Sequence, residues 1–257
     1  MHMLADRLYQ ASVTRLGSEE HLQIAGFLRE ADRTVIAKDA ALAVRDFVYE
    51  DPWQVECNLD LVERPTGPVW YEWPLETKAG HGGGDGATTG CLVLPYPGDE
   101  EAMAVVTGWD NGGNPRHSFA VALIDTALLA NLAWGARNLY SDEREDSLAR
   151  MMSVVTAGMP HGFSDEISIL TDGDKDAVDA AMRDATAEMP FLMAMFVFLK
   201  AEGGLEIRSE DGRKTAILSD IPGKSLAERA LDKFRRSAYK GLRRDEGKRQ
   251  TRLRWFR

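Results

Sequence analysis

The sequence predicts an α+β protein in which a central antiparallel sheet lies between N-terminal and C-terminal helices. Residues 3–45 repeat apolar side chains at helical spacing, whereas residues 47–125 contain short alternating runs bounded by proline and glycine. A long segment with apolar residues three and four positions apart then runs from residue 172 to residue 200. A block of helix, a block of strands and a second block of helix is typical of the α+β class.

The first block predicts two helices. Ser18 precedes two glutamates, as expected for an N-cap and an acidic first turn. Val35 and Val44 extend the helical pattern into a second, shorter helix. An apolar stripe follows the cap and consists of Ile24, Phe27, Leu28 and Ala31.

The middle block predicts an antiparallel meander of about five strands. Val55, Cys57, Leu59 and Leu61 alternate with polar residues, which indicates a half-buried strand. The other expected strands are 68–74, which has a proline at each end, 91–94, 102–106 and 118–124. The glycine-rich residues 80–86 predict a loop, and residues 110–114 predict a turn.

The last block predicts helices and one hairpin. Residues 126–157 are expected to be helical, and Pro190 should kink or divide a helix over 172–200. A hairpin is expected over 205–218, and a final amphipathic helix begins at Ser225. The apolar run 191–199 is much shorter than the ~20 residues that span a bilayer, so we expect a buried helix and no membrane partner. The face predicted for the first of these helices consists of Leu128, Leu132, Gly135 and Leu139.

Composition indicates a globular protein of a reducing compartment. The 257 residues are 44% hydrophobic and 28% charged, which is ordinary for a folded domain. Cys57 and Cys91 are the only cysteines, too few for a disulfide framework. The first ten residues have no apolar signal-peptide core, so we expect a cytoplasmic protein.

The net charge of −10 divides the chain into an acidic body, residues 1–223, and a basic tail, residues 224–257. The tail carries 13 Lys and Arg against 4 Asp and Glu, a net +9, whereas the body carries 18 against 37, a net −19. Such a body repels phosphate, which argues against general nucleic-acid binding by residues 1–223.

The basic tail has three interpretations. Cationic side chains interleaved with aromatic rings suit single-stranded nucleic acid. The favoured interpretation is that the tail docks on the acidic body of its own chain or on a protein partner, and the third is a solvated tail. The candidate binding residues are Arg235, Arg236, Lys240, Arg243, Arg244, Arg252 and Trp255.

Motifs for nucleotide, metal or nucleophilic chemistry are incomplete. Residues 81–84 read His-Gly-Gly-Gly, as in the oxyanion loop of some esterases, but the chain has no G-x-S-x-G nucleophile turn. The glycines are followed by no G-K-[ST], and the alternating aspartates at 172–176 lack the glycine and glutamate of a calcium loop. No histidine has a His or Cys at ligand spacing, although Asp110, His117 and His161 could assemble from a distance. We therefore expect no cofactor and no metal site.

The aromatic strand around Glu72 is the remaining chemical candidate. In a strand, Trp70 and Glu72 share one face, whereas Tyr71 and Trp73 share the other. A carboxylate beside indoles could be a general acid with a raised pKa, but a hydrogen bond to a buried indole is the favoured interpretation. The alternative function is a hydrolase with a site on the sheet near Glu72, Asp110 and His117.

The segment Pro68–Pro74, of the form P-x-x-W-x-E-W, resembles a strand of uncharacterised proteins from phages and prophage-like regions of bacterial genomes. A late apolar helix and a basic C-terminal segment are also similar, and the match covers about a third of the chain. The resemblance implies a genomic setting and no chemistry. The leading hypothesis is a non-enzymatic phage- or prophage-type accessory protein that acts through protein or nucleic-acid contacts.

Overall fold

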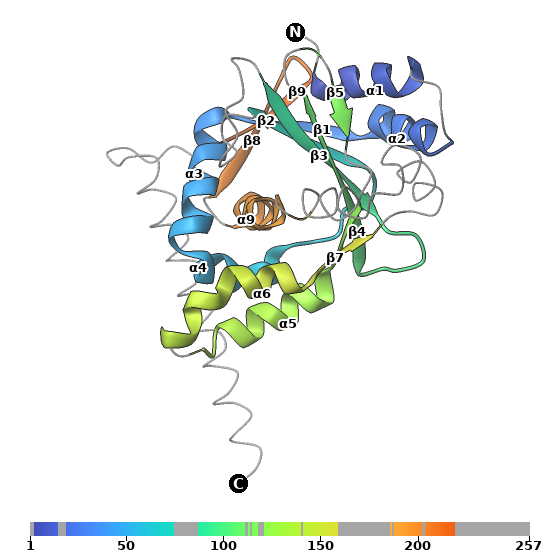
Figure 1. Cartoon of the computed structure of the whole chain (residues 1–257). Coiled ribbons are helices and arrows are strands. Elements are labelled where there is room, and N and C mark those ends of the chain that lie inside the picture. The colour runs from blue at the N-terminus through green and yellow to red at the C-terminus, as the bar shows by residue number, and fades with distance from the viewer. Residues whose placement is uncertain are drawn as a thin grey trace.

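The fold is one mixed sheet between two layers of helices, as a computed structural model shows (Figure 1). Helices α1 and α2 cover one face of the sheet, and α3 to α6 and α9 lie on the other. The α+β class is thus confirmed. The structure describes residues 3–14, 19–74, 87–110, 113, 115–117, 121–139, 141–158, 186, 188–201 and 204–218.

Nine described strands form the sheet, in the order β7-β6-β4-β3-β2-β1-β9-β8, with β5 paired to β4 beside this path. All pairings are antiparallel except those of β1, which runs parallel to both β2 and β9. The strands are β1 (Asp32–Ile36), β2 (Val69–Pro74), β3 (Thr88–Pro95), β4 (Ala102–Asp110), β5 (Pro115–His117), β6 (Val121–Asp125), β7 (Val155–Gly158), β8 (Leu205–Glu210) and β9 (Arg213–Leu218).

The described helices are short, and several differ from the prediction. They are α1 (Leu4–Thr14), α2 (Glu19–Glu30), α3 (Lys38–Glu50), α4 (Pro52–Glu56), α5 (Thr126–Ala136), α6 (Ser147–Ser153) and α9 (Met189–Lys200), with 3₁₀ turns η1 (Leu59–Leu61) and η3 (Ser141–Asp146). Within these residues, no helix has the length and apolar character needed to cross a bilayer.

Two strands replace parts of predicted helices. Val35 lies in β1 rather than in a helix, because backbone pairing on both sides fixes residues 32–36 at the centre of the sheet. Val155 begins β7, which pairs with β6, so the helical region predicted over 126–157 ends at Ser153.

The predicted strand 55–61 is wrong. Pro52 stands in the first turn of α4, where its missing N–H costs nothing. The five residues from Val55 to Leu59 are all buried, so burial does not alternate as it would in a half-buried strand. The other four predicted strands correspond to β2, β3, β4 and β6, and β5 was not predicted.

Helix α9 is the centre of the main core. All ten residues from Met189 to Phe198 are buried, and Figure 1 shows the helix enclosed between the sheet, α3 and α4–α6. Its rings meet Tyr71 at 5.7 Å and Trp73 at 5.0 Å between centroids. The predicted buried helix over 191–199 is confirmed, and Pro190 lies in its first turn; residues 172–185 lie outside the described residues.

The predicted hairpin over 205–218 is confirmed by the antiparallel pairing of β8 with β9. Asp211 and Gly212 both have positive φ, at 50° and 76°, which matches the two-residue Asp-Gly turns that suit the twist of a hairpin. The final helix predicted from Ser225 falls beyond the last described residue, Leu218.

Candidate functional site

Glu72 lies beneath the first turn of α1, on the sheet face that α1 and α2 cover. Its Oε2 accepts hydrogen bonds from the Trp70 indole N–H at 2.9 Å and from the Leu4 backbone N–H at 3.0 Å. Burial raises the pKa of Glu72 above its ordinary value, and these hydrogen bonds oppose that shift. The carboxylate therefore holds the start of α1 and the indole together, and the predicted sharing of one face by Trp70 and Glu72 is confirmed.

Asp110 belongs to the same covered face. Its side chain is 1% exposed, forms an ion pair with Arg7 of α1, and accepts a hydrogen bond from the Gly113 N–H at 2.7 Å. Through β3, strand register places Glu72 in a row with Gly90 and Gly108, with Asp110 two residues farther along β4. The structure thus brings Glu72 and Asp110 to one region under α1.

The backbone of His117 pairs with Gly108, so this residue stands in the cross-strand row of Glu72. Its side chain is outside the described part of the chain, as are His161 and the glycine-rich residues 80–86. The row is tightly filled near Glu72: a Cβ added at Gly90 would lie 2.5 Å from the Trp70 ring and 2.6 Å from the Tyr71 carbonyl oxygen. Space for a substrate is therefore absent over Gly90.

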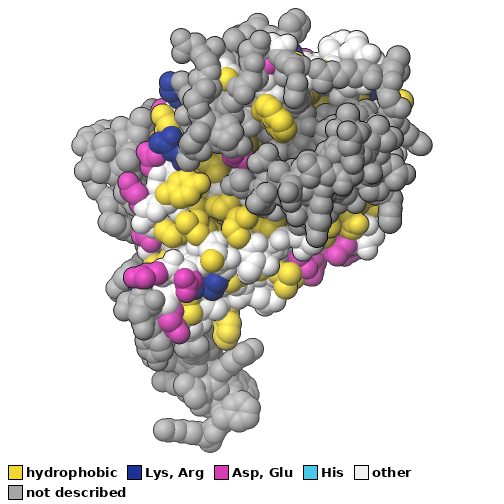
Figure 2. All heavy atoms as spheres, viewed as in Figure 1, with side chains coloured by type: hydrophobic (Ala, Val, Ile, Leu, Met, Phe, Trp, Pro, Cys, Tyr) yellow, Lys and Arg dark blue, Asp and Glu magenta, His cyan; other side chains and the backbone are white. Residues whose placement is uncertain are grey.

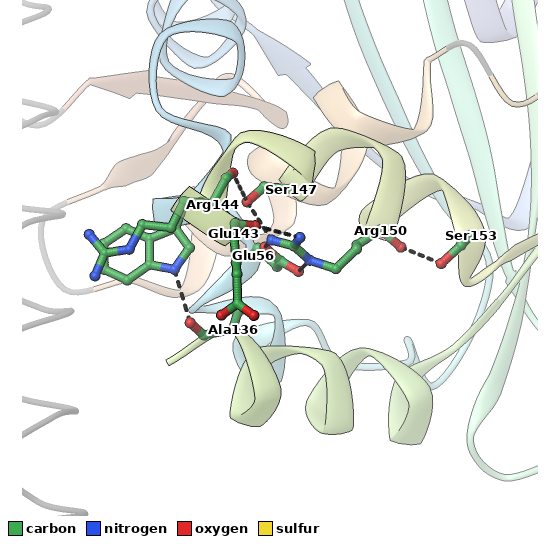
Figure 3. Close-up of polar contacts among 8 residues, drawn as sticks. Glu56, Ala136, Glu143, Arg144, Ser147, Arg150 and Ser153 are labelled. Carbon is green, nitrogen blue, oxygen red and sulfur yellow. Dashed lines mark hydrogen bonds and ion pairs between the residues drawn. The ribbon is translucent and has the colours of Figure 1, made fainter. Parts of the chain in front are cut away.

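A second buried polar cluster joins α4, α6 and η3 (Figure 3). The Glu56 side chain is 0% exposed and accepts from Arg150 Nε at 2.6 Å and Nη2 at 2.8 Å. Arg144 lies over the Trp53 ring at 3.7 Å, and the Trp53 indole donates to the Ala136 carbonyl of α5 at 2.9 Å. These contacts fix α5 and α6 on α4. The pair was not predicted, because residues 56 and 150 are 94 positions apart and no local pattern links them.

Both cysteine thiols are buried and free. Burial raises the pKa of Cys57 to about 12, and burial also raises the pKa of Cys91. A thiol held protonated in this way is a poor nucleophile. Neither cysteine supports a covalent mechanism.

A small apolar cavity and a broad hollow lie on the described surface. The cavity holds about 60 Å³ beside Tyr71 and Phe196, with the Glu63–Lys200 ion pair at its rim, and is far below the ~300 Å³ of ordinary ligand sites. The hollow, about 500 Å³, lies on the β8–β9 hairpin among the mixed charges of Arg208, Glu210 and Arg213. Across the described ranges, no group of three or more His, Cys, Asp or Glu could hold a metal ion.

Helix α5 is an apolar helix that remains exposed. Leu129, Ala133 and Ala136 are the buried residues of α5. Of the face predicted from Leu128, Leu132, Gly135 and Leu139, Leu132 packs against the main core and Leu128 is exposed. Trp134 is 62% exposed and Leu128 is 47% exposed. No residue of α5 is charged, whereas a surface helix ordinarily carries charges on its outer side. We call the outward arc of this helix the α5 face; it consists of Ala127, Leu128, Ala130, Asn131, Trp134 and Gly135.

Acidic residues lie at both ends of α5. Asp125 caps the helix by accepting from the Ala127 and Leu128 N–H groups, and the Glu101 carbonyl accepts from Thr126. Exposed Glu145 follows on η3. Figure 2 shows acidic side chains over the α5–α6 region at the lower part of this view, near single hydrophobic groups. The α5 face is thus apolar in its middle and acidic at its ends.

The tail candidates predicted from sequence fall beyond residue 218 and so lie outside the described residues: Arg235, Arg236, Lys240, Arg243, Arg244, Arg252 and Trp255. The sequence identified α5 as helical but did not identify its outward face. The one sequence feature that could have indicated this face is the lack of charged residues over 126–136.

No family model, no curated protein and no solved structure matches the chain.

Proposed function

We propose that this chain is a non-enzymatic accessory protein, of the phage-associated kind that the Trp70–Trp73 strand resembles, and that it binds another protein through the α5 face. The observation that carries the proposal is the exposure of Trp134 on a helix without charges. Helix α9, which is strongly apolar up to its last residue, Lys200, is buried in the core, as such helices ordinarily are. An exposed tryptophan among small residues is typical of the centre of a protein–protein interface.

The state of the buried ionisable groups supports a non-enzymatic role. Glu72 holds Trp70 and the start of α1, Asp110 pairs with Arg7, and Glu56 pairs with Arg150. Each of these carboxylates therefore has a structural partner. The hydrolase alternative keeps one supporting observation, which is the shared face of Glu72 and Asp110, but α1 covers that face.

A selection from a library of genomic fragments of the source organism tests the proposal. We expect at least one protein fragment to bind the full chain and to lose affinity when Trp134 is replaced. With the purified partner, Trp134→Ala should raise Kd by about tenfold or more, because a central tryptophan commonly contributes above ~1.4 kcal/mol. The binding should survive Glu72→Gln.

Tyr49→Ala is the matched control. Tyr49 is 53% exposed on α3, whose outward side carries charges such as Asp39 and Arg45. This change should leave Kd unaltered. Partners that bind the Trp134 and Tyr49 variants equally well would contradict the proposal.

A further inference from the structure

We infer that the α5 face is the docking site of the chain's own basic segment, residues 224–257, which covers it in the absence of a partner. This inference rests on the proposed function, because it concerns the regulation of the same surface. Residues 224–257 suit this face through their charge and their apolar pattern.

Charge complementarity is the first argument. Residues 224–257 carry a net +9, and the ends of α5 carry exposed acidic side chains, among them Glu101 and Glu145. Among the described cations near these ends, Arg137 pairs with Asp60 and Arg150 pairs with Glu56, so their charges are balanced. Arg144 lies over the Trp53 ring, and Arg64 donates to the Ala102 and Tyr96 carbonyls. The field around the α5 face therefore attracts a cationic segment.

The apolar pattern is the second argument. Apolar residues recur at helical spacing after Ser225, and the positions between them hold four cationic residues against two acidic ones, Glu228 and Asp232. The apolar side of such a helix can pack on the apolar middle of the α5 face, and its cationic residues can pair with the acidic residues at the ends. This is how amphipathic helices are recognised by apolar surfaces. The apolar positions are Leu226, Ala230, Leu231, Phe234 and Ala238.

The lengths are compatible. A helix over residues 225–238 would be about 21 Å long, and the eleven-residue α5 is about 16 Å long. The six residues 219–224 can extend about 20 Å from Leu218. Strand β6, which α5 contacts, lies five strand spacings or about 24 Å from β9, a distance that the linker and the helix after it span together. Residues 225–238 can therefore reach a neighbouring surface of the body.

Photo-cross-linking in the full chain tests the inference. Trp134→p-benzoylphenylalanine should give cross-links to peptides from residues 224–257 within one monomer. The matched position, Tyr49→p-benzoylphenylalanine, should give none. Circular dichroism must show the wild-type fold for each variant, and Leu128→p-benzoylphenylalanine serves as a second probe if the first variant does not fold.

Charge changes make the test specific. Glu101→Lys with Glu145→Lys should lower the cross-link yield at least fivefold, whereas the same charge change at distant exposed sites, Glu30→Lys with Glu206→Lys, should not. Adding Arg235→Glu and Arg236→Glu to the first pair should restore the yield.

Three outcomes would overturn the inference. Cross-links found only in dimers would assign the segment to a second copy. A segment that never reaches position 134 but binds single-stranded oligonucleotide in the same samples would assign it to nucleic acid. A protein partner that cross-links at position 134 when the segment does not would leave the proposed function standing and remove the regulation. If residues 224–257 cross-link to position 134 but no protein binds in a way that depends on Trp134, the proposed function is wrong and the docking inference stands.

Discussion

At the scale of single residues, buried carboxylates determine how the helices attach to the sheet and to one another. Glu72 and Glu56 are both withdrawn from water, yet their partners differ. Glu72 accepts from neutral N–H donors, whereas Glu56 accepts from a guanidinium. The two groups should therefore respond differently to pH and to substitution.

Glu72→Gln should lower the free energy of unfolding by about 1 kcal/mol or more at pH 5, because an amide replaces the buried carboxyl group that accepts the Trp70 and Leu4 hydrogen bonds. The pKa of Glu72 is raised in the folded state, so its contribution is fully present below the unfolded value and is lost as pH rises through the raised value. The difference in free energy of unfolding between wild type and Glu72→Gln should then narrow from pH 5 to pH 8. Urea titrations at each pH measure it.

Glu50→Gln is the control for this titration, because Glu50 is exposed on α3. The difference in free energy of unfolding between Glu50→Gln and wild type should stay near zero at every pH. A gap for Glu72→Gln that widens with pH would contradict the assignment of burial as the dominant cause.

Arg150→Met should cost about 3–5 kcal/mol, because it leaves the Glu56 carboxylate buried without its charged partner. The double variant Glu56→Leu with Arg150→Met should recover most of this loss, since two apolar groups of similar volume replace the pair. Chemical denaturation of the four proteins in the cycle gives the coupling energy. Equal stability of Arg150→Met and wild type would show that the pair is exposed in solution.

At the scale of elements, α5 has two faces made from the same residue types. Leu129 is fully buried in the main core and Leu128 is 47% exposed. Leu129→Ala should cost about 2–5 kcal/mol through lost burial and a cavity, whereas Leu128→Ala should cost clearly less, because it removes contacts with a docked segment and no core packing. Denaturation midpoints compare the two variants. An equal loss in the two variants would place Leu128 in the main core and not on the α5 face.

The sequence predicted which elements exist better than it predicted which way they face. Strong patterns, such as Pro68–Pro74, 191–199 and the Asp211–Gly212 hairpin, appear in the structure as expected. Helix α5 has no charged residue, so its sequence pattern did not distinguish the exposed Leu128 from the buried Leu129. Only packing against α4, α6 and η1 selects Leu129 over Leu128.

The secondary-structure predictions for residues 32–36 and 55–61 were wrong for different physical reasons. The first segment is five residues between two helices, and only its distant partners at 69–72 and 214–216 make it a strand. In the second, Val55 and Leu59 are spaced both for a strand face and for one turn of helix, and Pro52 favours the helix. The site under α1 was predicted in part. The hydrogen bond between Glu72 and an indole was expected, but the contacts of Leu4 with Glu72 and of Arg7 with Asp110 were not.

At the scale of the whole molecule, two separate cores of unequal size hold the layers together. Among the described residues, the main core around α9 contains 32 buried hydrophobic residues, and the core under α1 and α2 contains eight. The smaller layer should open at lower free energy. Native-state hydrogen exchange should show faster exchange in α1 and α2 than in α9, β3 and β4. Equal protection in both layers would show that the cores unfold as one unit.

The position of β1 also constrains how the chain is made. Thr34 pairs with Tyr71 on one side and with Lys214 on the other, and residues 34 and 214 are 180 positions apart. During translation β1 and β2 leave the ribosome first, so the other edge of β1 has no partner until β9 emerges, roughly 10–40 s later. An unpaired strand edge is a template for association with neighbouring chains. Nascent chains therefore have to protect this edge while most of the protein is still being synthesised.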